Sequence, residues 1–227
     1  MMKSTILTIV FFCIVPISLF GQLEQGTFLL GGGLSANSTH NEYSGDFFGD
    51  KYEVDELSFS FYPEIGYFII ENLALGLNAK LTLVGTTTDN NSDYYPEINS
   101  NSFEYLLGPF VRYYYPIKPI ALFAELNYQI GNRNQTSENY IPDSTGQWYL
   151  AENENKLDVS MFSTAIGVEY FITESIGLSA ALRYENGKRE YSQEDVAFQE
   201  EYSYEQKTDG FVFLVGLQIH LNFNGTN

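Results

Sequence analysis

The most constraining feature of this chain is an alternation of apolar and polar side chains that recurs in eight segments. In the last of them every odd position from Phe211 to Phe223 is apolar. A period of two places successive side chains on opposite faces of a β-strand. The eight predicted strands are 26–37, 57–69, 73–84, 103–115, 120–131, 157–172, 176–186 and 210–223.

The connections between these segments alternate strictly in length. Short connections occupy 69–72, 116–119 and 173–175, and long ones occupy 38–56, 85–102, 132–156 and 187–209. Soluble sandwiches usually mix connection lengths, whereas a transmembrane barrel has short turns at one rim and long loops at the other. We therefore predict an all-β fold: an eight-stranded antiparallel up-and-down transmembrane β-barrel with short periplasmic turns and four long extracellular loops.

The segment 73–83, LALGLNAKLTL, separates the two faces most clearly. Leucine or alanine occupies its odd positions, and Asn78 and Lys80 lie on the other face. A charge on a lipid-facing position at mid-bilayer costs about 2–4 kcal/mol, and no charge falls on the apolar face assigned in 57–186. That face is therefore predicted to contact lipid. In the first segment the glycines at 31–33 interrupt the alternation, so the sequence does not assign which face of this strand points outward.

The opposite face carries three acids and three bases, namely Glu64, Lys80, Arg112, Glu125, Glu169 and Arg183. Eight strands enclose an interior only just wide enough for side chains to fill. A buried charge that loses its partner costs about 3–5 kcal/mol. We predict a lumen closed by a salt-bridge network, without assigning the pairs. The alternative is a narrow conduit for small ions or protons.

Three strands that precede short connections end on a tyrosine followed directly by a second aromatic: Tyr67–Phe68, Tyr113–Tyr114 and Tyr170–Phe171. Tyrosine suits the boundary between hydrocarbon and water because its ring is apolar and its hydroxyl needs a partner. We predict that Tyr67, Tyr113 and Tyr170 form half of an interfacial aromatic girdle. The other half would be Phe103, Tyr105, Tyr128 and Tyr184. The alternative is the general preference of tyrosine for strands.

The N-terminal segment has the three parts of a secretory signal peptide: a positive charge at Lys3, an uncharged apolar run through Phe20, and the small residue Gly21. We predict a signal peptide at 1–21 and a transmembrane β-barrel domain at 22–227. A retained membrane anchor is the alternative. Cleavage would remove Cys13, so the exported chain would contain no disulfide.

The formal net charge of −18 argues against nucleic acid and acidic lipid surfaces as partners. Most of the 29 acidic residues fall in the four long connections, which predicts a solvated, mutually repelling rim. Binding of Ca²⁺ or Mg²⁺ by these carboxylates is the alternative. The run 89–93 lacks the final glutamate of a dedicated calcium loop. We predict no metal site and no cofactor.

The whole pattern resembles the OmpA/OmpX-type eight-stranded outer-membrane barrels and the small porin-like barrel families. The residues that carry this resemblance are the signal peptide, the eight amphipathic strands, endings such as Gly66–Phe68, and the aromatic last strand. The resemblance implies a bacterial outer-membrane location, with outer-membrane lipid and lipopolysaccharide as partners. It also implies that the barrel-assembly machinery reads the last strand through Phe211, Phe213, Leu221 and Phe223. The tail 224–227 departs from relatives that end on the aromatic itself.

The leading functional hypothesis is a non-enzymatic outer-membrane barrel with an envelope-structural or surface-interaction role. Its acidic extracellular loops would contact an extracellular ligand or surface, because a peptidoglycan-binding domain would find no room after the last strand. We expect His220 to be a hydrogen-bonded lumen residue and His40 to lie in the first long loop. We predict no catalytic residue.

Three alternative functions stay open. A lipid-modifying enzyme would draw on His40, Ser92 and Asp93, because nucleophilic catalysis needs a base beside the hydroxyl. A narrow-channel porin-like protein would conduct solute through the lumen. A soluble lipocalin-like barrel would require an apolar interior and a polar exterior, which is the reverse of the predicted faces.

Overall fold

The structure, a computed structural model, describes residues 23–44, 51–89, 98–142, 148–195 and 200–223. The predicted signal peptide lies outside these residues. Eight strands form one closed barrel: β1 (Thr27–Ser44), β2 (Lys51–Ile70), β3 (Leu73–Asp89), β4 (Ile98–Ile117), β5 (Ile120–Pro142), β6 (Trp148–Phe171), β7 (Ile176–Asp195) and β8 (Glu200–Asn222). Within the described ranges, no helix is long and apolar enough to cross a membrane.

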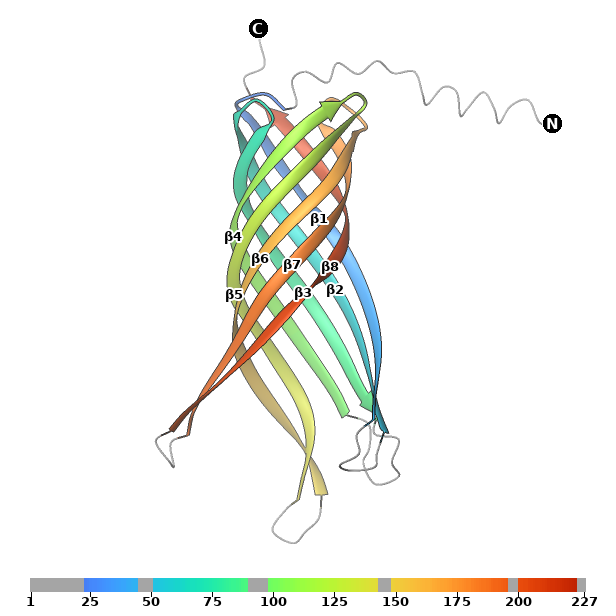
Figure 1. Cartoon of the computed structure of the whole chain (residues 1–227), viewed down its shortest axis with the longest axis vertical. Helices are drawn as coiled ribbons and strands as arrows, with labels where there is room; N and C mark the ends of the chain where they lie inside the picture. The colour runs from blue at the N-terminus through green and yellow to red at the C-terminus, as the bar shows by residue number, and fades with distance from the viewer. Residues whose placement is uncertain (1–22, 45–50, 90–97, 143–147, 196–199, 224–227) are drawn as a thin grey trace, which may run out of the picture.

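Each strand pairs antiparallel with its neighbours in chain order, and β8 returns to β1. The predicted fold class is therefore confirmed. Figure 1 shows the strongly tilted strands, with the three short turns gathered at one end of the barrel. The turn between Ile70 and Leu73 contains Asn72 with a φ of 64°, a left-handed conformation that asparagine tolerates better than most residues.

The strands are longer than the alternation predicted, and this is a correction. Much of each predicted long connection is strand, so that β5 and β6 pair as far as Pro142 and Trp148, and β7 and β8 as far as Asp195 and Glu200. Figure 1 shows these pairs leaving the barrel as separate hairpins at the end opposite the short turns. Beyond the apolar zone both faces of a hairpin meet water, so the alternation that marks a strand disappears while the backbone ladder continues.

The two faces of the wall are inverted relative to a soluble protein. On β3, Leu77 is 51% exposed, whereas the adjacent Asn78 is 1% exposed. β1, whose outward face the sequence left unassigned, has the same orientation of faces. Leu29 is buried in the lumen and Leu34 is exposed on the exterior. The exterior is thus apolar, and the lumen holds nearly all of the buried polar groups.

Lumen glycines make room for aromatic rings. A Cβ on Gly167 would lie 2.3 Å from Cζ of Phe123, and one on Gly76 would lie 2.6 Å from Cε1 of Phe110. Neither distance is compatible with a side chain, and the backbone oxygens of Ile65 and Ala180 would also lie within 2.2 Å and 2.7 Å of the added carbons. The glycine on one strand therefore allows a phenylalanine from another strand to pack directly against its backbone.

Candidate functional site

The inner ionic network, defined as Glu64, Arg112, Glu125 and Arg183, joins four strands across the lumen. Arg112 donates from Nη2 to Oε2 of Glu64 at 2.7 Å and from Nε to Oε2 of Glu125 at 2.8 Å. Oε1 of Glu125 accepts from Nη2 of Arg183 at 2.9 Å. All four side chains are buried, so their charge-assisted hydrogen bonds replace the water that each group loses.

Aromatic rings cover the two arginines of this network. The guanidinium carbon of Arg112 lies 4.8 Å from the ring centre of Phe123, and that of Arg183 lies 4.8 Å from the ring centre of Tyr62. A cation over a ring face is stabilised by the ring quadrupole, most strongly where water is excluded. The inner network is therefore packed against rings as well as paired.

The outer ionic network, defined as Lys80, Glu104, Glu185 and Arg189, lies further from the short turns. Nζ of Lys80 lies 2.6 Å from Oε2 of Glu185 and 3.7 Å from Oε1 of Glu104. Nη2 of Arg189 lies 3.0 Å from Oε2 of Glu104. Tyr62 donates its hydroxyl hydrogen to Oε1 of Glu185 at 3.2 Å, so the two networks touch the same ring.

Glu169 and His220 form a third buried group close to the short turns. Nε2 of His220 lies 2.7 Å from Oε1 of Glu169, and both side chains are fully enclosed. The ring centres of Phe68 and Phe171 lie 5.9 Å and 5.5 Å from that of His220. This end of the lumen is accordingly filled by aromatic side chains around one polar pair.

The structure places all six sequence-predicted lumen charges inside the barrel. It brings Glu64, Arg112, Glu125 and Arg183 together and gives Lys80 and Glu169 other partners. Sequence reasoning missed Glu104, Glu185 and Arg189. Continuing the period of two would have found the first two, since Glu104 lies two residues before Leu106 and Glu185 two residues after Arg183.

His40 was wrongly expected in a loop. It lies in β1 opposite Asp55 of β2, and its Nδ1 is 2.7 Å from Oδ1 of Asp55. The pKa of His40 is raised, chiefly by this hydrogen bond. Ser92 and Asp93 lie outside the described residues. Among the residues that are described, no group of three or more histidine, cysteine or acidic side chains is placed to hold a metal ion.

The predicted interfacial tyrosines lie on the exterior near the short turns. Tyr67, Tyr113 and Tyr170 are exposed, while the aromatic that follows each of them points into the lumen and is buried. At the other boundary Phe103, Tyr105 and Tyr128 are exposed and Tyr184 is partly exposed. Membrane anchoring by these rings stays a prediction.

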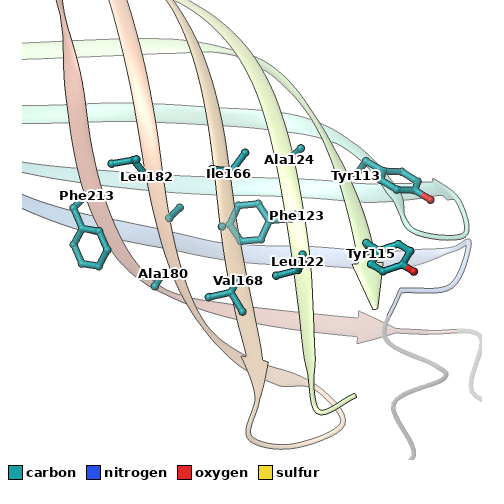
Figure 2. A pocket seen from close by; sticks show the side chains of 12 residues that line it. Tyr113, Tyr115, Leu122, Phe123, Ala124, Ile166, Val168, Ala180, Leu182 and Phe213 are labelled. Carbon is teal, nitrogen blue, oxygen red and sulfur yellow. The ribbon is translucent and has the colours of Figure 1, made fainter. Parts of the chain in front are cut away.

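The exterior also contains a shallow apolar depression of about 570 Å³ on β4–β8. Figure 2 shows Leu122, Ile166, Val168 and Leu182 around it, with the small residue Ala180 on the neighbouring strand beside Val168. Its walls offer few polar atoms, so in a membrane it would accommodate hydrocarbon chains.

The predicted assembly-signal residues of β8 also face outward. Phe211, Phe213 and Phe223 are strongly exposed, and Leu221 is partly exposed. β8 closes the barrel beside β1, as expected of a last strand. Recognition of these side chains by an assembly machinery stays a prediction.

An apolar exterior, an ionic lumen and a closed ring of eight strands together define a transmembrane β-barrel. Such barrels span the bacterial outer membrane, and we place the protein there.

Comparison with known proteins supports this class. No family model and no curated protein matches the chain. OprG, an outer membrane protein from Pseudomonas aeruginosa, has a similar structure with a TM-score of 0.50 and 13% identity, covering 88% of this chain and 97% of OprG. Neisserial surface protein A gives a TM-score of 0.43 at 13% identity, covering 86% and 97% of the two chains. The outer membrane protein AlkL gives 0.40 at 14% identity, covering 94% and 98%. The fold is that of the OmpA/OmpX-type eight-stranded barrels.

Proposed function

We propose that this protein is a non-enzymatic outer-membrane barrel that does not conduct solutes and that presents its long hairpins to an extracellular ligand or surface. The observation that carries the proposal is that buried side chains close the lumen on the side of the short turns. Two ionic networks and the aromatic layer around His220 follow one another along the barrel axis. A solute crossing this path would have to separate paired, desolvated charges. Leaving a buried charge without its partner is energetically unfavourable.

The hairpins supply the surface-interaction part of the proposal. Their described portions carry exposed ion pairs, such as Lys188 with Glu190 and Glu205, within a strongly acidic segment. Glu205 has a lowered pKa because Lys188 donates a hydrogen bond to it. An acidic, hydrogen-bonded hairpin is a stable platform for a cationic partner.

Conductance tests the first part. The purified protein, inserted into planar lipid bilayers, should give no unitary conductance steps, whereas a porin measured in the same bilayers should. Reproducible open channels in the wild-type protein would contradict a closed lumen.

Hairpin truncation tests the second part. Glu190 and Glu205 lie opposite each other on β7 and β8, so replacing 191–204 by Asn-Gly should close the hairpin with a two-residue turn. Cells carrying this variant should attach less to a cationic surface than wild-type cells, while its heat-modifiable gel migration stays normal. Equal attachment by wild-type, truncated and deletion strains would refute the surface role.

A further inference from the structure

The closure between β1 and β8 covers only part of the wall. Residues Thr27–Leu34 of β1 pair with residues Val215–Asn222 of β8. Away from this paired part, β1 remains paired with β2 as far as Ser44, and β8 remains paired with β7 as far as Glu200. Beyond Leu34 and Val215 each strand follows its own hairpin. The outer half of the barrel therefore has an opening between β1 and β8 in the wall itself.

A cavity passes through this opening. It has a volume of about 620 Å³, and its lining includes the lumen residues Tyr62 and Lys80 together with Phe211 and Phe213, which face outward. A separate exterior groove of about 590 Å³ is lined by apolar residues that include Leu34, Phe59, Leu83 and Phe103. Ser35, Ala36 and Ser60 line both spaces. A polar chamber and an apolar groove thus meet at the opening.

Two oppositely charged side chains on the chamber wall have no ion-pair partner within 4.0 Å among the described residues. Arg133 of β5 donates from Nη2 to Oγ of Ser102 at 2.7 Å, but its Nε is buried without a hydrogen bond, and within the described residues no carboxylate lies within 4.0 Å of it. Glu56 of β2 attracts Arg133 electrostatically but makes no hydrogen bond or ion pair with any described residue. Among the other charges facing the chamber, those of the outer ionic network are paired with one another, and Asp209 accepts a hydrogen bond from the hydroxyl of Tyr184 at 3.4 Å.

The chamber also lies at a suitable depth. A tilted strand needs about 9–11 residues to cross the hydrocarbon. Counted from the short turns, where β2 ends at Ile70 and β5 begins at Ile120, both Glu56 and Arg133 lie just beyond that length. The groove residue Leu83 lies at its edge on β3. Charges without a direct ion pair, at headgroup depth, therefore adjoin an apolar groove at acyl-chain depth.

We propose that the opening between β1 and β8 binds an acyl-chain amphiphile with a zwitterionic phosphate-and-amine head. The phosphate lies against Arg133, because a guanidinium with free N–H groups matches phosphate oxygens. The ammonium lies toward Glu56, and the chain passes Ala36 into the exterior groove. This occupant supplies a direct ion-pair partner to both side chains and leaves the net charge of the chamber unchanged.

Native mass spectrometry of the detergent-solubilised protein with palmitoyl lysophosphatidylethanolamine tests the proposal. We expect one bound lipid, with apparent affinity at least roughly tenfold lower for Arg133→Met, because a charge-assisted pair is lost. Glu56→Gln should weaken binding of this lipid but not of lysophosphatidylglycerol, which has no amine. Ala36→Trp should block the chain at the opening. Lys207→Met, which removes an exposed cation of β8, is the matched control and should leave binding unchanged.

The ligand arms separate the parts of the site. Phosphoethanolamine without a chain and monopalmitoylglycerol without a charge should both bind much more weakly than the lysolipid. Heat-modifiable migration and circular dichroism establish that each variant is folded before its binding is scored. Undiminished binding to folded Arg133→Met and Ala36→Trp would overturn the proposal. So would equal effects of Glu56→Gln on the lipids with and without an amine.

Discussion

Replacing Glu125 with glutamine should destabilise the barrel more than any other single change in the ionic lumen. Glu125 is the acid that both arginines of the inner network share, and its side chain is 1% exposed. Glutamine preserves the size of the side chain, so no cavity forms. It removes the negative charge and places an N–H donor where two guanidinium groups also donate.

The magnitude follows from what each arginine retains. Arg112 keeps Glu64 at 2.7 Å, whereas Arg183 loses its only carboxylate within 4.0 Å among the described residues. Two N–H groups of Arg183, Nε and Nη1, already lack a protein hydrogen bond. Stranding one buried charge costs about 3–5 kcal/mol, and we expect Glu125→Gln to lower the free energy of unfolding by that amount.

A second substitution should recover most of this loss. Arg183→Met in the Glu125→Gln background removes the stranded charge and leaves a shorter apolar chain. Replacing buried ions with apolar groups is often neutral. Urea unfolding in lipid vesicles, followed by heat-modifiable migration and circular dichroism, gives the free energies. Glu205→Gln breaks an exposed ion pair and is the control, with no measurable change expected. A Glu125→Gln loss below about 1 kcal/mol, typical of an ordinary substitution, would refute the argument.

The remaining predictions concern the exterior and the hairpins. Leu77 lies near the middle of the membrane-crossing part of β3 and Leu83 near its edge, so Leu77→Arg should cost about 2–4 kcal/mol and Leu83→Arg about 0–1 kcal/mol in vesicles; equal losses would contradict the assigned depth. The raised pKa of His40 means that its pairing with Asp55 stabilises the fold below the ordinary pKa of 6.5 and that this contribution disappears as the pH rises through the native value. An NMR titration should show the pKa of His40 falling back toward 6.5 in Asp55→Asn, and an unchanged pKa would rule out Asp55 as the cause.

The faces of the barrel were predictable because lipid excludes charge from one of them. The alternation in β3 therefore assigned Leu77 to the exterior and Asn78 to the lumen without knowledge of the fold. The six predicted charges were found by the same rule. Where water reaches both faces this selection ends, and the strands that continue through the predicted loops carry no comparable pattern.

The partners within the lumen could not be predicted. Lys80 and Glu185 are 105 residues apart in sequence and lie on β3 and β7, which are not adjacent in the ring. Whether these two side chains are in contact depends on the stagger between strands. The alternation of polar and apolar residues gives no information about that stagger. Arg189 was further hidden because it falls in a segment that polarity on both faces marked as loop.

β1 and β8 are in close contact along one part of their length and separate along the rest. Glycines explain the close contact. A Cβ on Gly216 would lie 2.5 Å from the carbonyl oxygen of Gly32, and one on Gly31 would lie 2.6 Å from that of Leu217. Backbones this close exclude side chains, so the paired half of the seam depends on glycine from both strands. Past Leu34 no such pairing continues, and each strand is held only by its hairpin partner. The glycines at 31–33, which interrupt the alternation in the sequence, thus lie in the part of β1 that closes the barrel. Ser35 and Ala36, which follow them, lie where β1 and β8 are no longer paired.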